Sequence, residues 1–355
     1  MAHLCFRSSG RPGSRWAAAV ATAPLAWLAG CGGAPAGSTA PAAASPTAAT
    51  VDRVVAFPMP GATAVLAATR RAEALAGAHA EAVAALAASP LREDYGAALR
   101  ASTAMVGAGF RPNVEELLRV RPDLVMQWAD RGAGLVEPIE RAGLRVLPVR
   151  LGTEADARAA LADLGDATGT SARVEAMLAW RDRVERELAA VRATLASPAP
   201  RVLYVPRIGG GYQAAGGDHY VEEALARAGG RNAASALRGT PLLGPEQIVE
   251  LAPEVLVLGS FEPATSVERL LRDPRLAAVP AIRDRRVYHV PIGGYRWDPP
   301  SQESPLYWLW LAHRLHPQAP WPALEPAVVE AFEVLYGVRL DATAARAIAE
   351  RRWPS

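Results

Sequence analysis

The sequence predicts an α/β protein with two lobes of similar construction, joined by one long α-helix. Three observations lead to this prediction. Short apolar, strand-like runs alternate with helical stretches, this pattern occurs twice along the chain, and a long amphipathic stretch separates the two occurrences. Strands that alternate with helices form parallel sheets covered by helices. Two such halves therefore predict two separate sheets.

The first thirty residues differ in composition from the rest of the chain. Residues 1–15 contain Arg7, Arg11 and Arg15 and no acidic residue. An apolar run from Trp16 to Gly30 follows, and it is too short to span a bilayer. A basic segment followed by a short apolar run is typical of a secretory signal. We therefore expect residues 1–30 to be a signal peptide.

A cysteine follows this apolar run directly. Leu28–Cys31 resembles a bacterial lipobox, which implies cleavage before Cys31 and lipidation of its thiol. The alternative is an ordinary signal peptide with an incidental cysteine. Residues 31–50 are poor in large apolar residues and carry no charge, so they cannot bury enough surface to fold. They are predicted to form a flexible linker between a membrane anchor and the fold.

The remaining chain is close to neutral. The whole sequence has a formal charge of +2, and removal of the three N-terminal arginines leaves about −1. No basic tract remains, so nucleic acid is not an expected partner. Cys5 lies in the predicted signal and Cys31 is the predicted anchor, so no disulfide or thiolate metal site is expected in the fold. Roughly 305 residues are enough for one large or two medium domains.

The chain from residue 51 repeats itself loosely. Arg53–Pro58 and Arg201–Pro206 are short β-rich runs that end in proline, as expected of buried strands. Glu115–Met126 and Glu246–Val257 each predict a short amphipathic helix, a proline turn and an apolar strand. Each half also contains a later strand-like run, at Leu144–Val149 and Arg286–Pro291.

One long helix is predicted between the two halves. From Ser171 to Ser197 apolar residues recur at a helical period, with charges elsewhere. These apolar positions are Val174, Met177, Leu178, Val184, Leu188, Val191 and Leu195. At about 1.5 Å per residue, the stretch reaches roughly 40 Å, enough to cross from one lobe to the other. The expected divisions are an N-terminal lobe over 51–168, a linking helix over 169–198, and a C-terminal lobe with terminal helices over 199–355.

Two Rossmann-like lobes joined by a long helix, behind a lipobox, resemble the periplasmic binding proteins for iron-siderophores, haem and cobalamin. One subset of that family binds molybdate or tungstate. The resemblance covers residues 52–316, and its most specific parts are the two helix–proline–strand repeats and Gly293–Leu306. Tyr307–Ala312 is similar to the late helix of the family.

The resemblance implies a function as well as a fold. It implies a ligand cleft between two lobes that close only slightly, and capture of a small metal chelate, an iron-siderophore first and cobalamin or haem next. It also implies delivery to an ABC permease dimer with its ATPase. The metal is then cargo and no resident cofactor is expected. We expect a monomer, lipid-anchored in the periplasm or on the cell surface.

In this family, one acidic residue on each lobe docks onto arginines of the permease. The matching positions here are Glu115 and Glu246. Each lies at the start of a predicted helix, where the helix dipole tolerates a carboxylate. One acid on each lobe gives two points of electrostatic contact, which fix orientation and speed encounter. The alternative is that both residues only cap their helices.

Four loops are expected to hold the ligand, because α/β lobes bind ligands beyond the carboxyl ends of their strands. They are Pro58–Thr63, Gln127–Arg131, Pro206–Tyr212 and Ile292–Asp298. Aromatic side chains there suit a planar chelate, and arginines supply donors for carboxylate, phosphate or oxyanion groups. Packing and solvation are the alternative explanations. The candidates are Met59, Trp128, Arg131, Arg207, Tyr212, Tyr295, Arg296 and Trp297.

Other kinds of function have weaker support. The histidines show no paired ligand spacing, so a bare zinc or manganese site is not expected, although His219 or Tyr220 remains open as a haem ligand. No nucleophile elbow, HExxH or P-loop pattern is present, so we do not expect an enzyme. A cleft hydrolase using Asp218 and His219 is one alternative, and a ligand-sensing lipoprotein is another. Glu325–Arg352 predicts further helices.

Overall fold

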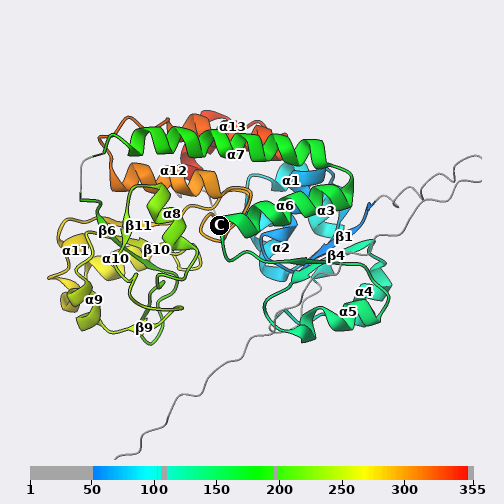
Figure 1. Cartoon of the computed structure of the whole chain (residues 1–355), viewed down its shortest axis with the longest axis horizontal. Helices are drawn as coiled ribbons and strands as arrows, with labels where there is room; N and C mark the ends of the chain where they lie inside the picture. Colours follow the sequence, from blue (N-terminus) through cyan, green and yellow to red (C-terminus); the bar gives the residue numbers. More distant parts are fainter. Residues whose placement is uncertain (1–50, 102, 105–109, 196–197, 351–355) are drawn as a thin grey trace, which may run out of the picture. The chain divides into compact units, whose positions relative to one another are not determined.

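The N-terminal half of the computed structural model is built on a five-stranded sheet with the order β3-β2-β1-β4-β5 (Figure 1). All its strand pairs are parallel. The strands are β1 (Val54–Ala56), β2 (Leu75–Ala78), β3 (Thr103–Ala104), β4 (Leu124–Trp128) and β5 (Val146–Val149). The helical elements are α1 (Gly61–Thr69), η1 (Ala72–Ala74), α2 (Ala80–Ala87), α3 (Arg92–Ala101), α4 (Val114–Val120), η3 (Ala133–Leu135), α5 (Glu137–Arg141) and α6 (Glu154–Thr168). The central strands are buried throughout, as parallel strands covered on both faces must be.

The C-terminal half contains a second parallel sheet, with the order β11-β10-β6-β8. Its strands are β6 (Arg201–Val205), β8 (Arg231–Asn232), β10 (Val255–Leu258) and β11 (Val287–His289). Its helical elements are α8 (Val221–Arg227), α9 (Pro245–Leu251), α10 (Ser266–Leu271), η4 (Pro274–Leu276) and α11 (Pro280–Arg283). A short antiparallel pair, β7 (Tyr212–Gln213) and β9 (Leu242–Leu243), is added beside it. The predicted α/β class with two parallel sheets is confirmed.

The internal repeat extends to individual hydrogen bonds. In both halves a helix ends in a left-handed residue before proline, Arg121 (φ 51°) after α4 and Ala252 (φ 42°) after α9. The acidic residue after that proline then binds the backbone of the first strand. Asp123 accepts from the Arg53 N–H at 2.9 Å, and Glu254 accepts from the Arg201 N–H at 2.8 Å. The same local sequence thus fixes the same strand register twice.

The structure describes residues 51–101, 103–104, 110–195 and 198–350. The predicted signal peptide, the lipidation site Cys31 and the linker lie outside these residues. From Ala49 onward the chain groups as one compact unit. Among the described residues, no helix combines the length and apolar character needed to span a bilayer.

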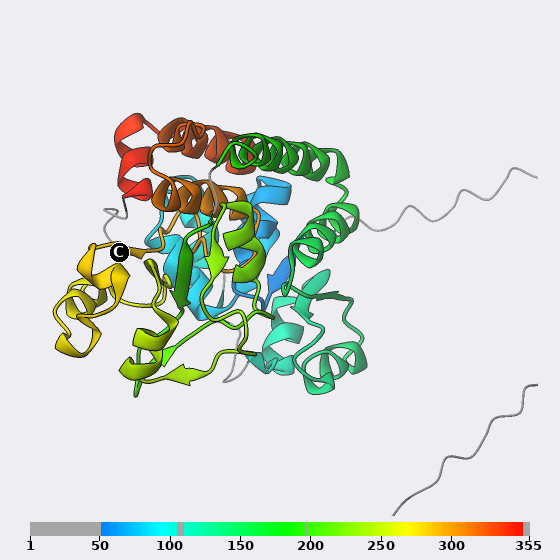
Figure 2. The same cartoon turned by 60° about the vertical axis from the view of Figure 1, so that its left-hand side comes forward.

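The predicted linking helix is α7 (Ser171–Arg192), 22 residues long. It ends before the predicted Ser197, because the Thr194 hydroxyl and the Leu195 N–H bind the carbonyls of the last helical turn. Three further helices follow the second sheet: α12 (Ser304–Leu315), α13 (Leu324–Tyr336) and α14 (Ala342–Ala349). Both α12 and α13 pack against α7 and run beside it (Figures 1 and 2).

Helix α13, the last helix but one, also packs against α1 in the first half of the chain. Arg70, which ends α1, donates to the Glu333 carbonyl at 2.6 Å. Tyr95 on α3 donates its hydroxyl to the Tyr336 carbonyl at 2.7 Å. Helix α13 therefore packs against helices of the first half of the chain.

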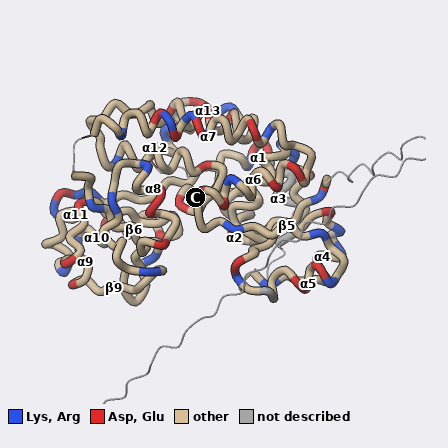
Figure 3. Tube along the Cα trace, viewed as in Figure 1, with Lys and Arg blue, Asp and Glu red and all other residues tan. Residues whose placement is uncertain are grey.

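A buried ion pair connects α6, α7 and the segment before α12. Arg181 on α7 makes a two-pronged contact with Glu154 at the start of α6, and only 1% and 7% of the two side chains are exposed. Arg181 also donates to the Ser301 carbonyl at 2.9 Å and lies over the Trp308 ring, 4.9 Å from its centroid. Residues of both charge signs are mixed along α7 (Figure 3). Arg181 is thus a central contact among three elements.

The close packing of α6 on α7 depends on Gly165. A Cβ atom at this position would lie 2.8 Å from Cγ2 of Val174 and 3.3 Å from Cα of Ser171. We expect Gly165→Ala to lower the free energy of unfolding by about 1–3 kcal/mol, because overpacking forces the helices apart. Urea denaturation measures this change. Gly134→Ala is the matched control, since its Cβ would meet nothing within 4 Å. Equal stability of the two variants would contradict the prediction.

Candidate functional site

Two arginines of the C-terminal half lie over one phenylalanine beyond the carboxyl ends of its strands. Phe261 follows β10, and the guanidinium carbon of Arg207, after β6, lies 4.7 Å from its ring centroid. The guanidinium carbon of Arg296, after β11, lies 4.3 Å from the same centroid. We call Arg207, Phe261 and Arg296 the C-terminal cluster. Its three residues come from three neighbouring strand ends, as the topology requires.

The guanidinium of Arg296 donates one hydrogen bond at standard geometry among the described residues. Its Nη1 donates to the Ser260 carbonyl at 2.5 Å, whereas its buried Nε–H has no acceptor among the described residues. Asp298 fixes Ser260 in turn, because its carboxylate accepts from the Ser260 N–H at 2.9 Å and from the Tyr204 hydroxyl at 2.6 Å. One face of the guanidinium is therefore positioned and the other keeps donor capacity.

A second cluster occupies the corresponding end of the first sheet. The guanidinium carbon of Arg131 lies 3.9 Å from the ring centroid of Trp128, at the end of β4, and 5.3 Å from that of Phe110. Phe110 also contacts His79, with ring centroids 4.9 Å apart. We call His79, Phe110, Trp128 and Arg131 the N-terminal cluster. It repeats the arrangement of a cation on an aromatic face.

The guanidinium groups of both clusters, those of Arg131, Arg207 and Arg296, have no carboxylate partner within the described part of the chain. Burial lowers the pKa of His79, with the Glu81 carboxylate opposing this, so its imidazole is neutral near pH 7. The net charge offered by the three guanidinium groups therefore favours an anionic partner.

The loop after β11 connects the two halves. A Cβ atom at Gly294 would lie 2.7 Å from Cδ1 of Leu91, which lies between α2 and α3. Burial raises the pKa of Tyr295, and the Glu81 carboxylate on α2 adds to this rise. The Tyr295 hydroxyl meets no acceptor or donor at standard hydrogen-bond geometry, although Arg296 lies near enough to lower its pKa. The Arg296 loop therefore lies within electrostatic range of the N-terminal half.

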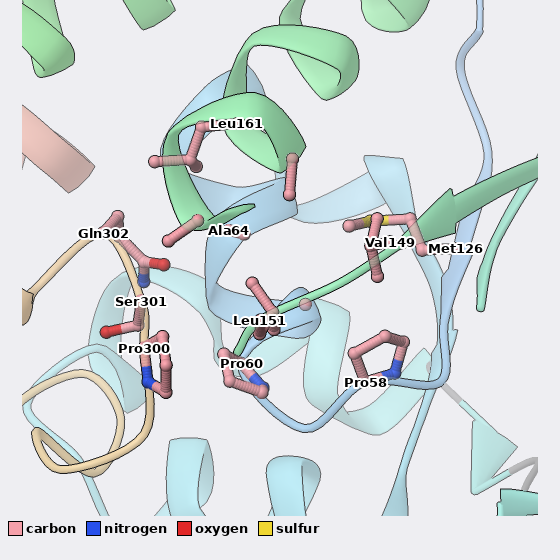
Figure 4. Close-up of a pocket in the computed structure, with 13 residues that line it drawn as sticks. Pro58, Pro60, Ala64, Met126, Val149, Leu151, Leu161, Pro300, Ser301 and Gln302 are labelled. Carbon is pink, nitrogen blue, oxygen red and sulfur yellow. The ribbon is translucent and has the colours of Figure 1, made fainter. Parts of the chain in front are cut away.

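The loop Pro58–Thr63 borders a small apolar recess. Figure 4 shows Pro58 on one side, Gln302 on the other, and Leu151 with Pro60 between them. Its free volume is about 20 Å³, room for about one water molecule. Such a space does not hold a chelate, so this recess is a wall of the fold and not the ligand pocket.

Comparison with known proteins identifies the family. The model of the family "Periplasmic binding protein" matches residues 64–292. This chain belongs to that family. No curated protein matches it. Members of this family are solute-binding proteins, and membership of the family implies a periplasmic location for this protein.

Solved structures agree with this fold. A periplasmic solute binding protein from Veillonella parvula DSM 2008 is 22% identical, with a TM-score of 0.74 over 84% of this chain and 92% of the other. CeuE from Helicobacter pylori, in a Ni-His complex, is 18% identical with a TM-score of 0.67 over 83% and 93%. The molybdate periplasmic binding protein MolA from Haemophilus influenzae, bound to molybdate, is 19% identical with a TM-score of 0.66 over 82% and 94%.

This periplasmic binding protein buries four of its candidate residues, Trp128, Tyr212, Tyr295 and Trp297, and half-buries Met59. Trp297 is fully buried, and its Nε1–H donates to Glu303 at 2.9 Å. Tyr212 lies in β7 and not in a loop, and its hydroxyl contacts Asp273 at 3.0 Å, in a polar pocket beside α9. Met59 packs in part against the core. The expectation that Trp297 and Tyr212 offer flat surfaces from loops is therefore corrected, since each side chain has an internal partner.

The two acids expected to dock onto a permease are at the surface. Glu115 lies in the first turn of α4 and Glu246 in the first turn of α9, and both are exposed. An exposed leucine accompanies each of them. Leu118, one helical turn from Glu115, is 49% exposed, and Leu242, shortly before α9, is 56% exposed. Acid and apolar surface thus occur together on each half.

The histidines of this binding protein have internal roles. His316 and His313 contact the carbonyls of Gly229 and Pro322, at 3.0 and 2.8 Å. His219 accepts from the Val221 N–H at 3.2 Å, and only 6% of Tyr220 is exposed. Among the described residues, no group of three or more His, Cys, Asp or Glu side chains is arranged to hold a metal ion.

Sequence reasoning identified Trp128 but missed the other aromatic members of the two clusters, Phe261, His79 and Phe110. Phe261 follows a predicted strand directly, so the rule that nominated the other loops also applies to it. His79 follows β2, a strand the sequence did not reveal because Leu75–Ala78 contains two alanines and a glycine. Phe110 reaches Trp128 across 17 intervening positions, and no local sequence signal marks this contact.

Proposed function

We propose that this periplasmic binding protein captures a small anionic metal chelate, with an iron-siderophore as the first candidate, and delivers it to an ABC permease. The observation that carries the proposal is the pair of clusters, each an unpaired guanidinium on an aromatic face beyond the strand ends. A chelate of this class presents flat ligand groups around a metal and a net negative charge. Aromatic faces suit the former and guanidinium donors the latter.

Molybdate or tungstate is the second candidate. The buried Nε–H of Arg296 favours it, because an oxyanion accepts hydrogen bonds from fixed donors. The chelate is preferred because three guanidinium groups without a carboxylate partner suit a ligand with several anionic groups. The structures of CeuE with Ni-His and of MolA with molybdate include examples of both kinds of cargo in this fold. A hydrolase receives no support from a family of solute-binding proteins.

Delivery requires a membrane anchor and a docking face. We propose that lipidated Cys31 tethers the protein, and that Glu115 and Glu246 contact arginines of the permease dimer. Their exposure and their equivalent places on α4 and α9 support this assignment. The exposed Leu118 and Leu242 add apolar contact area beside the charges. A ligand-sensing lipoprotein needs no such pair of matched acids.

Tryptophan fluorescence tests the choice of cargo. The protein from residue 51 onward is titrated with ferric siderophores, cobalamin, haem, molybdate and tungstate, since Trp128 lies in the N-terminal cluster. Saturable quenching by a chelate at micromolar or tighter affinity supports the proposal. A response to molybdate or tungstate alone assigns the protein to oxyanion binding. No response to any of the compounds contradicts a metal-containing cargo.

The arginines of the C-terminal cluster should determine this affinity. We expect Arg207→Gln and Arg296→Gln each to raise the Kd of the identified cargo by about ten- to a hundredfold, because each removes a charge-assisted hydrogen bond. Arg275→Gln is the matched control, since Arg275 lies in the same half but is paired with Asp273 at 2.7 Å. The same fluorescence titration measures all three. Equal affinities in the cluster variants and the control would remove Arg207 and Arg296 from the site.

A further inference from the structure

The loop that carries Arg296 is folded around one buried carboxylate, that of Glu303. This residue precedes α12 directly, and its exposed fraction is 0%. The carboxylate accepts hydrogen bonds from the backbone N–H groups of Gly294 and Tyr295, at 3.1 and 3.2 Å. The indole N–H of Trp297 is a third donor, at 2.9 Å. Three donors on one short loop thus converge on a single side chain.

A fourth donor comes from a different part of the chain. The Tyr336 hydroxyl, on α13, donates to Oε1 of Glu303. An ionised carboxylate has about four lone-pair positions, so these donors use all of its capacity. In the described residues, no cation forms a salt bridge with Glu303. Neutral donors alone therefore stabilise this charge, and most of them belong to the ligand loop.

The glycines of the loop are required by this arrangement. A Cβ atom at Gly293 would lie 2.1 Å from Oε2 of Glu303, and one at Gly294 would lie 2.8 Å from Oε1. Both distances are shorter than atoms tolerate without displacement, so only glycine lets the backbone approach the carboxylate. The loop and Glu303 therefore form one packed unit.

Arg296 lies between two residues that Glu303 holds. Its neighbours Tyr295 and Trp297 are anchored to the carboxylate, while its own guanidinium extends to Phe261 and the Ser260 carbonyl. We propose that Glu303 is a positioning residue for ligand binding, which fixes the Arg296 guanidinium over Phe261 without itself touching the ligand. The proposal rests on the assignment of the C-terminal cluster as the ligand site.

The charge on Glu303 gives the proposal a pH signature. Burial raises the pKa of this carboxyl to about 7, and the hydrogen bonds from Tyr336 and Trp297 oppose the rise. When Glu303 is protonated, one oxygen carries a proton and one of the donors loses its acceptor. The other titratable or charged groups around the loop are Tyr295, Tyr336, Asp298 and, on α2, Glu81. We therefore expect the loop to loosen, and the Kd to rise, as pH falls below about 7.

The test uses the full chain and compares Glu303→Gln with Glu333→Gln. The control makes the same change at an exposed acid of α13, whose side chain pairs with Arg339 at 3.4 Å. Two quantities are measured between pH 5.5 and 8.5: the Kd of the cargo identified by the panel above, and the 15N-indole resonance of Trp297, assigned with Trp297→Phe. We expect Glu303→Gln to raise the Kd about tenfold or more at pH 8, because buried donors lose their acceptor. We also expect it to remove both the pH dependence of the indole resonance and the low-pH weakening.

Each outcome decides one question. If Glu303→Gln retains the wild-type indole resonance, affinity and pH profile, the proposal is overturned. A second outcome concerns the double variant. If Glu303→Gln raises the Kd but Arg296→Gln adds its full effect in that background, Glu303 does not act through Arg296 and the proposal is also overturned. A much smaller added effect of Arg296→Gln supports the proposal. If no compound in the panel binds, the proposed cargo fails, while the indole titration still reports whether Glu303 holds the loop.

Discussion

Reversing both docking acids, Glu115→Arg together with Glu246→Arg, should abolish uptake of the cargo into cells and leave its affinity for the isolated protein unchanged. Both side chains are exposed, and neither belongs to a ligand cluster. Two repulsive contacts replace two attractive ones, and like charges across an interface cost several kcal/mol. Uptake of radiolabelled cargo and the fluorescence Kd are the two measurements.

The loss of uptake should depend on where the two reversed acids lie, and not only on the change in net charge. The control reverses two other exposed acids, Glu140 on α5 and Glu250 on α9, which gives the same net charge. We expect this control to retain uptake. Transport that survives the Glu115 and Glu246 reversal would show that these residues only cap their helices. Loss of uptake in both double variants would point to a general effect of charge.

Breaking the buried Glu154–Arg181 pair should produce the largest loss of stability. Removing one partner leaves the other as an unpaired buried charge, which costs about 3–5 kcal/mol. Arg181→Met also removes the donor to Ser301 and the contact with Trp308. We expect Glu154→Gln and Arg181→Met to lower the free energy of unfolding by about this amount, measured by urea denaturation.

Two further variants test whether the loss of stability comes from the burial of the ion pair or from the loss of an ion pair as such. Arg183 lies on the same helix but pairs with Glu187 and with Glu330 near the surface, where all three side chains are more than a third exposed. Arg183→Gln should therefore change stability by about 1 kcal/mol or less. The double change Glu154→Leu with Arg181→Met should be less harmful than either single change, because no charge remains buried. Single variants within 1 kcal/mol of the wild type would show that the pair is not essential.

The sequence revealed the repeated elements because their signals are local. The helix, proline and strand of Glu115–Met126 and Glu246–Val257 appear in the structure as α4 with β4 and α9 with β10. Amphipathic spacing, a proline stop and an apolar run all lie within a dozen residues. The family resemblance, which the family match confirms, depended on these same segments.

The orientation of aromatic side chains was not available from the sequence. Trp128 ends β4 and Trp297 lies in the loop after β11. The buried carboxylate of Glu303, just before α12, accepts a hydrogen bond from Trp297, whereas Arg131 covers Trp128. These partners are set by tertiary contacts, which no local pattern encodes. The segment Gly293–Leu306 was recognised as specific, yet its central feature, Glu303 beneath two glycines, became apparent only from the packing.

The return of α13 to the first half also affects the order in which the chain folds. Arg70, Tyr95 and Arg173 all bind carbonyls of residues 333–336, more than 160 positions later in the chain. Part of the helical packing in the first half of the chain therefore has to wait for α13. Contacts of such long sequence separation slow folding, because loop closure must precede the stabilising contacts. We therefore expect the helices α1, α3 and α7 to gain these contacts only after α13 has been synthesised.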